Sequence, residues 1–548
     1  MMRFPACRGP EGEAAATPPT ELLLADTNAT ATEQEQWRSR CPGSCEIETR
    51  LQEHFQKILV FVQEETRGLS FYDIERALIP LIFALGRLCL VLCLSYRHEE
   101  LEVASCETRQ GRTYRRRTAQ SRLLGTFFGK VRYWRTYRHA AGGGYYPLDE
   151  QLKLPAGGFS FHLCNLMTRL ATKMSYIQAA LVVRCFLGWA PSQDTLERTV
   201  FGLARHTSAF FEHAALPEED GAVMIIMIDC KATPTATEQE LEKRRGPRTP
   251  ALVPGSARHR GRARRKRWGR KKRRKKGDKS KNGKMATLVV MYTLRPGHDQ
   301  DGRPVLVGPI NKRVYASYAP KRHAFAVARR DADRRGFHRG CGKVLQLVTD
   351  GDLDLSFYAQ KFFPEAIHTL DAIHAIEALW EAGRGRHKEG SAELAQWVEL
   401  QKMRLYDGRI QETLDELTQI LETMPKTGPG SKGKRKRVET TLNYLKNRIA
   451  MMNYKELLEK DLEISSGPVE GAIRHVIAQR FDEGGMRWIK ERAEALLQLR
   501  CIEINGQWEE FMRFVHATGW LDSANVSPRG VALQVSAPDP LPTYGVTA

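Results

Sequence analysis

Met224-Ile225-Ile226-Met227-Ile228-Asp229 is the stretch that decides the fold of this 548-residue chain. Five consecutive apolar residues predict a strand that is buried on both faces. The run ends on a carboxylate, which is costly to bury unless a metal ion or a charged partner meets it. The stretch therefore predicts a central strand that carries a functional acid, Asp229, at its tip.

A second strand of the same kind is predicted at Val344–Thr349 and ends on Asp350, and a third acid, Glu470, opens a predicted helix. In-line attack on a phosphodiester needs an activated nucleophile and a stabilised leaving oxygen, and two metal ions about 3.5–4 Å apart supply both. Mg²⁺ prefers carboxylate oxygens and keeps waters and phosphate oxygens as its other ligands, so three carboxylates suffice. Asp229, Asp350 and Glu470 are therefore the predicted catalytic and metal-binding residues, with two Mg²⁺ ions that Mn²⁺ can replace.

The elements around these acids predict an α/β fold class. Further strands are expected at 286–294, 313–318 and 366–370, with helices at 323–335, 355–363 and after Asp371. The order is three strands, helix, strand, helix, strand, helix, which is the succession of an RNase H-like catalytic core. Residues 390–463 are helical and charged, and we interpret them as an α-helical insertion before the last catalytic helix, with a basic glycine-rich loop at 427–437.

The chain preceding this core is expected to be a mainly helical DNA-binding region. Gly125–Tyr137 predicts a small β-hairpin with a basic face. Two helices at 174–187 and 192–205, with a turn at 188–191, resemble a helix-turn-helix within residues 158–206. A packed helix pair without a DNA-binding role is the alternative. The predicted boundaries are a disordered N-terminus at 1–45, the DNA-binding region at 46–220, the first segment of the core at 221–389 with a cationic insert at 240–284, the insertion at 390–463, the second segment of the core with C-terminal helices at 464–520, and a tail at 521–548.

The formal net charge of +21 is concentrated in one segment. Between Arg258 and Lys284 there are 17 Lys/Arg and one Asp, which leaves about +5 for the rest of the chain. Such a block binds polyanions, and an aromatic residue within it suits contact with DNA bases. Nuclear localisation fits this composition equally well in a eukaryotic source. The predicted DNA-binding residues are Arg264, Arg265, Lys266, Arg267, Trp268, Arg270, Lys271, Lys272, Arg273, Arg274, Lys275 and Lys276.

Residues 77–94 form the one candidate membrane segment that the sequence offers. Arg87 lies near its middle, Pro80 interrupts its start, and its length is at the short limit for a span. A buried helix, for example at a subunit interface, is therefore predicted instead. The eleven cysteines show no zinc-ligand spacing and indicate a reducing compartment, and no secretion signal is recognised.

Asp229 and Asp350 each have an alternative interpretation. Asp229 can end a strand as a simple turn residue, or form a buried ion pair with Lys231. Asp350 is followed by Asp352 and Asp354. The apolar run ends directly before Asp350, which favours it, but an Asp-Gly-Asp sequence is also an ordinary loop.

The third acid and the residues around it also leave alternatives. Glu470 can be a first-turn acid that the helix dipole favours, and Glu463 is the rival ligand. Asp371 and His374 are three apart and can share a helix face. His374 then contacts phosphate or tunes the metal shell, or the two residues are a hydrogen-bonded pair inside the fold. Arg474, one turn after Glu470, contacts phosphate or pairs with that glutamate.

Five segments of the chain carry a resemblance to a known family. They are GTFFGKVRYWRTYRH (125–139), PLDEQLKLPAGGFS (147–160), DCKATPTATEQELEKRRG (229–246), LDAIHAIEALW (370–380) and SGPVEGAIRHVIAQRFDEGGMRWIKERAEALLQLRCIEINGQWEEF (466–511). These segments resemble the ISKra-type bacterial insertion-sequence transposases of the DDE group. The resemblance covers about 125–515, and its C-terminal segment is the most specific. It implies an RNase H-like core, divalent metal, DNA transposition and the acidic triad Asp229, Asp350 and Glu470, with Asp371 and His374 similar to an accessory motif. Cys230 departs from the glycine expected in relatives.

The function expected from these observations is Mg²⁺-dependent cleavage and strand transfer of double-stranded DNA, at transposon ends and target. A homodimer or higher oligomer is expected in the bacterial cytoplasm at the nucleoid, with no membrane and no small-molecule substrate. One alternative is an RNase H-like nuclease that cuts without joining. The other is a non-catalytic DNA-binding protein derived from a transposase, which would bind DNA without metal.

Overall fold

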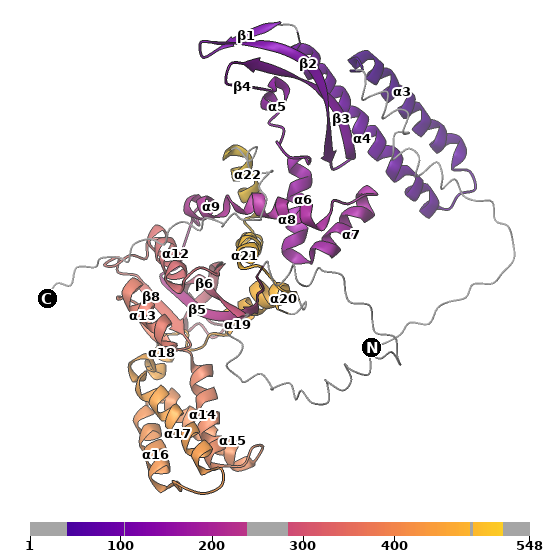
Figure 1. The fold of residues 1–548 in the computed structure, drawn as a ribbon. Helices are drawn as coiled ribbons and strands as arrows, with labels where there is room; N and C mark the ends of the chain where they lie inside the picture. Colours follow the sequence, from indigo (N-terminus) through magenta and orange to yellow (C-terminus); the bar gives the residue numbers. More distant parts are fainter. Residues whose placement is uncertain (1–40, 103–104, 238–282, 483–485, 519–548) are drawn as a thin grey trace, which may run out of the picture. The chain divides into compact units, whose positions relative to one another are not determined.

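The computed structural model describes residues 41–102, 105–237, 283–482 and 486–518 (Figure 1). The chain divides into two compact units. Within the described residues, the first unit comprises the chain up to Thr168 together with Tyr176–Thr199. The second comprises Arg169–Ser175 and Val200–Thr518. Each unit is described by itself.

The second unit is built on a mixed five-stranded sheet with the order β7-β6-β5-β8-β9. The first three strands are antiparallel, whereas β8 and β9 are parallel to β5 and to each other. The predicted strands at 224–229, 286–294, 313–318, 344–349 and 366–370 are all present, and the fold is α/β as expected. The strands are β5 (Val223–Pro234), β6 (Gly283–His298), β7 (Pro304–Ser317), β8 (Val344–Thr349) and β9 (Ile367–Leu370).

The central strand β5 is buried because both of its faces are covered. Met224, Ile226 and Ile228 point to one face and pack with helices α12 (Lys321–Arg334) and α13 (Leu353–Phe362). Side chains alternate along a strand, so Ile225, Met227 and Asp229 face the other side. This alternation places Asp229 on the opposite face from the α12 and α13 core.

A helical excursion follows β9. It comprises α14 (Ala372–Arg386), α15 (Ala392–Tyr406), α16 (Ile410–Thr423), α17 (Ser431–Lys446), the 3₁₀ turn η3 (Ile449–Met451) and α18 (Tyr454–Glu459). Figure 1 shows α14 to α17 as a bundle beside the sheet. The helices agree with the predicted insertion, but the prediction of a basic loop at 427–437 was wrong for its second half. The residues from Ser431 onward form the first turns of α17, because Lys and Arg are good helix formers.

The chain returns to the sheet through α19 (Gly467–Ala472), which continues into the π-helical turn η4 (Ile473–Ala478). The next helices are α20 (Gln479–Phe481), α21 (Lys490–Ile504) and α22 (Trp508–Thr518). Ten consecutive residues of α21, Ala493–Ile502, are buried. They include Glu494, whose carboxylate accepts hydrogen bonds from Ser317 Oγ (2.7 Å) and the Tyr318 N–H (2.5 Å) at the end of β7.

The first unit contains a helical hairpin and a four-stranded antiparallel sheet, β1-β2-β3-β4. The predicted hairpin at 125–137 is present, but it is only the end of this larger sheet, because β2 and β3 extend over 15 and 12 residues. The elements are α3 (Ser44–Val60), η1 (Phe61–Glu65), α4 (Phe71–Leu101), β1 (Cys106–Arg109), β2 (Arg112–Thr126), β3 (Gly129–Ala140), β4 (Gly143–Tyr145), α5 (Pro147–Gln151), α6 (Phe161–Lys173), α7 (Tyr176–Leu187) and α8 (Gln193–Ala204), and α9 (Thr207–His213) follows in the second unit.

Helix α4 contains the segment 77–94, which was predicted to be buried, for example at a subunit interface, and that burial by a second subunit stays a prediction. Only 17% of its most apolar window is buried within the described residues. Arg87, the charge near its middle, donates a hydrogen bond to the Phe128 carbonyl (2.9 Å) at the β2–β3 turn. By length and composition α4 can cross a membrane, and a single such helix is weak evidence for a span.

The predicted helix pair at 174–187 and 192–205 is present as α7 and α8. Gly188 has φ +69° at the turn between them, a backbone conformation that favours glycine. Ser192 caps α8 as predicted, because its Oγ accepts a hydrogen bond from the Thr195 N–H (3.2 Å). A DNA-binding role for this pair stays a prediction.

Candidate functional site

Asp350 directly follows β8, whereas Asp229 lies inside β5, which continues to Pro234 in its pairing with β6. The predicted end of the strand at Asp229 was therefore wrong. The register pairs Ile228 with Thr349, so Asp229 and Asp350 are neighbours at the point where the pairing of β5 with β8 ends. Adjacent strands lie about 4.8 Å apart, which brings the two acids together. Their role as one catalytic site stays a prediction.

The Asp229 carboxylate lies in a buried environment with other negative charges nearby. Burial raises the pKa of the Asp229 carboxyl, and the negative charges of Asp350 and Asp371 raise it further. The Cys230 N–H, which donates to Asp229 Oδ1 (2.5 Å), and the nearby His374 act in the opposite direction. A divalent cation between these carboxylates would offset both the burial and the repulsion.

The turn that carries Asp350 is held by the helical excursion. Tyr444 Oη donates a hydrogen bond to the Asp350 carbonyl (2.8 Å), and Arg448 Nε donates to the Gly351 carbonyl (2.7 Å). Gly351 has φ +77°, and a Cβ there would lie 2.5 Å from Arg448 Nε and 2.7 Å from a methyl carbon of Leu370. Any side chain at Gly351 would therefore displace the turn. The glycine in Asp350-Gly351-Asp352 was a sequence signal for a tight turn, whereas no sequence pattern pointed to Tyr444 or Arg448.

The neighbouring acids of Asp350 have other roles. Asp352 caps α13 by accepting hydrogen bonds from the N–H groups of Asp354 (2.9 Å) and Leu355 (3.3 Å), and it also pairs with Lys321 Nζ (2.9 Å). Asp354 lies within 3.5 Å of the same lysine. Asp350 is therefore the acid of this turn that remains available to the site.

Lys231, the possible ion-pair partner of Asp229, is engaged elsewhere. Lys231 Nζ lies 3.6 Å from the Asp482 carboxylate. Cys230, the departure from the family pattern, points away from Asp229 because neighbouring side chains on a strand alternate. Burial raises the pKa of its thiol to about 11, so the thiol stays protonated at neutral pH.

Glu470 lies on α19. One of its carboxylate oxygens, a carboxylate oxygen of Asp371 and a ring nitrogen of His374 all lie within 4.8 Å of one another, a group that could hold a metal ion and that does not include Asp229 or Asp350. Among the described residues, no hydrogen bond or ion pair engages the exposed Glu470 carboxylate. A role for Glu470 as the third acid beside Asp229 and Asp350 stays a prediction.

The rival Glu463 lies away from the strand tips. Its Oε1 accepts a hydrogen bond from Tyr292 Oη (2.7 Å). Tyr292 pairs with Ile225 on β5, four residues before Asp229 and thus about 13 Å along the strand. Glu463 is therefore too far along β5 to share a metal ion with Asp229.

Asp371 joins the two chain segments that enter and leave the helical excursion. It is fully buried, and its Oδ1 accepts hydrogen bonds from the N–H groups of Ile373 (3.0 Å) and Ser466 (3.1 Å). Its Oδ2 accepts from the Ser466 hydroxyl and from His374 Nδ1 (2.5 Å). Because both oxygens are occupied, Asp371 is a positioning residue rather than a free ligand. Ser466, which the sequence did not single out, anchors the start of α19.

The Asp371–His374 pair fixes the orientation of the imidazole. The hydrogen bond to Asp371 raises the pKa of His374 to about 9, although burial opposes the shift. The reciprocal effect lowers the pKa of Asp371, where the bonds from His374 and Ser466 outweigh burial. The sequence left two alternatives for Asp371 and His374: a role in the site, or a hydrogen-bonded pair inside the fold. The structure contains the hydrogen-bonded pair. Because Nδ1 of His374 makes this bond, its Nε2 is the ring nitrogen that can face the site.

The remaining predicted site residues are less well supported. Arg474 is exposed in η4, and no ion pair joins it to Glu470 in the described chain. The predicted DNA-binding residues lie outside the described residues. They are Arg264, Arg265, Lys266, Arg267, Trp268, Arg270, Lys271, Lys272, Arg273, Arg274, Lys275 and Lys276.

A cleft of about 550 Å³ opens from Asp350 and His374 between α14 and α17. Its α14 side carries Glu377 and Glu381, and its α17 side carries basic residues. Arg437 Nε lies 3.8 Å from Glu381 across it. The other lining residues are Ala378, Gly433, Lys436, Thr440, Thr441 and Tyr444. The cleft gives an extended ligand a route to the acidic site.

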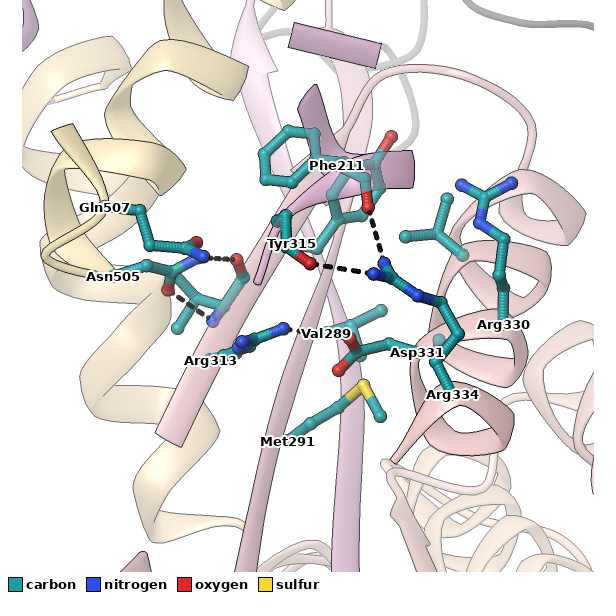
Figure 2. Close-up of a pocket in the computed structure, with 14 residues that line it drawn as sticks. Phe211, Val289, Met291, Arg313, Tyr315, Arg330, Asp331, Arg334, Asn505 and Gln507 are labelled. Carbon is teal, nitrogen blue, oxygen red and sulfur yellow. Dashed lines mark hydrogen bonds and ion pairs between the residues drawn. The ribbon is translucent and has the colours of Figure 1, made fainter. Parts of the chain in front are cut away.

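A second hollow, of about 40 Å³, lies against β7 and α12 (Figure 2). Its polar groups bond to one another: Arg313 pairs with Asp331 (3.1 Å), and Arg334 donates to the Ala214 carbonyl (2.7 Å). The amide of Asn505 bonds to both backbone groups of Val314 (2.8 and 3.0 Å), so it covers part of the edge strand β7. This hollow has room for about one water molecule and has a structural role.

Comparison of the chain with known proteins adds no assignment to this geometry. No protein-family model matches the sequence, and no curated protein matches it.

Proposed function

We propose that the protein is a DDE transposase that cleaves DNA and joins 3′-hydroxyl ends to target DNA, using an RNase H-like core. The observation that carries the proposal is the pair of neighbouring acids, Asp229 on β5 and Asp350 directly after β8, and we take Glu470 as the third acid. The strand order, with three antiparallel strands followed by two parallel ones on the far side of β5, is the order that the RNase H-like interpretation requires.

The donor set of this site fits divalent metal ions. Asp229, Asp350 and Glu470 are carboxylates, the ligand class that Mg²⁺ prefers, and their mutual repulsion is relieved by positive charge. Bound Mg²⁺ would supply Lewis-acid stabilisation of the phosphate and of the leaving oxygen. The chain itself orients the acids: Tyr444 and Arg448 hold the turn of Asp350, while Asp371 holds Ser466 and the imidazole of His374.

Metal binding should appear as a change in stability. With Mg²⁺ at ten times its dissociation constant, the free energy of unfolding should rise by about 1.4 kcal/mol, or about 2 °C or more in melting temperature. Asp229→Asn and Asp350→Asn should lose most of this rise, because each removes a ligand charge. Differential scanning fluorimetry in EDTA and in MgCl₂, with NaCl at matched ionic strength, measures it. An equal rise in both variants would contradict a metal site at these acids.

The test of the function is a product analysis. Full-length protein is incubated with Mg²⁺ or Mn²⁺ and labelled duplex DNA from the flanks of its own coding sequence, with a supercoiled plasmid as target. Joined products that disappear in Asp229→Asn, Asp350→Asn and Glu470→Gln support the transposase. Glu463→Gln is the matched control and should keep full activity. Cleavage without joining favours a nuclease, and binding without products under either metal favours a DNA-binding derivative.

A further inference from the structure

The end of the first unit's sheet that lies away from the β2–β3 turn is exposed on both faces. We define the arginine ribbon as residues 106–118, which comprise β1 and the first half of β2. Apart from the half-buried Tyr114, every one of its residues is exposed. The hydrophobic core of this unit instead uses the other end of the sheet, with Leu124, Val131 and Tyr133. A ribbon open on both faces gains little from apolar burial, so packing does not explain its sequence.

Three exposed arginines of the ribbon are available for a ligand. Arg112, Arg115 and Arg117 form no ion pair or hydrogen bond through their side chains within the described residues. Arginines without partners so close together repel one another, and the arrangement costs stability without a bound polyanion. Arg115 and Arg117 are two residues apart on β2, whereas Arg112 is three residues from Arg115, so strand alternation places Arg112 on the other face of the sheet.

Two of the three acids near the ribbon are paired with other arginines, and the third, Glu107, is bound by a neutral tyrosine. Glu102 pairs with Arg116 (2.9 Å), and Glu107 accepts a hydrogen bond from Tyr145 Oη (2.7 Å). Glu150 pairs with Arg109 (2.6 Å). These contacts also brace the ribbon: Tyr114 packs edge-on against Tyr145, with ring centroids 5.2 Å apart. The ribbon is therefore a supported element that presents unneutralised charge.

A β-bulge changes the direction of the last of the three arginines. Arg116 pairs with Arg138, but the next pair in the register is Ala119 with Thr136. Two residues of β2, Arg117 and Thr118, thus lie opposite one residue of β3. Such a bulge bends the strand and increases its twist, so Arg117 departs from the direction that simple alternation would give it.

We propose that the arginine ribbon binds double-stranded DNA outside the acidic site, with its two-stranded tip in the major groove. The ribbon is two-stranded only before Arg115, because from Arg115 onward β2 also pairs with β3. The major groove is about 12 Å wide and admits a two-stranded β-ribbon, and arginine forms bidentate bonds both to phosphate and to guanine. Duplex RNA is disfavoured because its major groove is too deep and narrow for side chains to read. The exposed tip, Arg109-Gln110-Gly111-Arg112, has no apolar side chain to insert into a lipid surface. This inference rests on the proposed function and names a part of the chain that binds the DNA substrate.

The test measures binding separately from chemistry. Full-length Arg112→Ala/Arg115→Ala/Arg117→Ala is titrated in EDTA onto a labelled 30-base-pair duplex, the matching single strand and the same sequence as duplex RNA. The matched control, Lys57→Ala/Arg67→Ala/Arg76→Ala, removes three exposed cations from the helical hairpin of the same unit. The cationic segment at 258–284 is unchanged in all three proteins, so its contribution cancels in the comparison.

We expect the ribbon variant to lose about tenfold or more in duplex affinity at 150 mM NaCl, and its salt slope to fall by about 2–3. The control should lose less than twofold. Equal losses in both variants, unchanged duplex affinity, or an equal loss for single strand and duplex RNA would overturn the proposal. Unchanged melting temperatures show that both variants fold. Loss of ribbon-dependent binding and absence of strand-transfer products are separate results, so either proposal can fail alone.

Discussion

Asp229→Asn is expected to lower the rate of metal-dependent DNA cleavage by about 10³-fold or more, which corresponds to about 4 kcal/mol of lost transition-state stabilisation. Asparagine keeps the size of the side chain and an oxygen ligand but removes the charge that a divalent metal requires. Asp229 lies inside the central strand β5, where it pairs with Leu288 of β6, so the backbone around it is held by the sheet and will not adapt to the loss.

The same substitution should leave the fold unharmed. Burial and the neighbouring Asp350 raise the pKa of the Asp229 carboxyl, so the ionised form is disfavoured there without metal. A neutral amide removes this repulsion, and the free energy of unfolding in EDTA should be unchanged or rise by about 1 kcal/mol. Urea unfolding measured beside single-turnover cleavage tests both effects. A large loss of stability with intact cleavage would show that Asp229 is a structural residue.

Asp220→Ala is expected to lower the free energy of unfolding by about 3–5 kcal/mol. Asp220 Oδ2 and Oδ1 accept hydrogen bonds from Arg335 Nε (2.8 Å) and Nη2 (2.7 Å), and the arginine side chain is fully buried. Asp220 also accepts from Asn311 (3.0 Å) and Thr293 (2.9 Å). Alanine would leave a buried guanidinium with Asp331 as its remaining acid, 3.5 Å from one nitrogen.

The controls for this prediction separate charge from packing. Glu219→Ala, at the adjacent exposed position, should change stability by less than about 0.5 kcal/mol. Asp220→Ala/Arg335→Met removes both charges and should recover a large part of the loss, because no buried charge is left without a partner. Equilibrium urea unfolding of the four proteins gives the values. A double variant as unstable as Asp220→Ala would contradict the ion-pair explanation.

The sheet and its two acids could be predicted because their signals are local. An unbroken apolar run such as 224–228 fits a strand buried on both faces, and the acid that ends it is conspicuous. The same pattern identified 344–349 and Asp350. Choosing Glu470 over Glu463 needed tertiary contacts, since both are acids near the start of α19. Tyr292, which engages Glu463, is 171 residues away in sequence.

Long-range polar contacts explain most of what the sequence left open. Asp371 bonds to Ser466 across 95 residues, and Tyr444 reaches Asp350 across 94. Neither hydroxyl lies in a recognisable pattern. The exposure of α4 within the described chain could not be predicted for a related reason: apolar composition predicts burial, but it does not say whether the same chain or a second subunit covers the surface.

The two ends of the helical excursion meet at one point, and this has an evolutionary consequence. The Ala372 N–H donates to the Ile464 carbonyl (2.9 Å), and Asp371 holds Ser466 directly beside it. A segment whose ends are already in contact can be gained, lengthened or exchanged without moving the strand before it or the helix after it. The excursion is thus an exchangeable module, and relatives with a shorter or unrelated module between β9 and α19 would keep the same arrangement of acids.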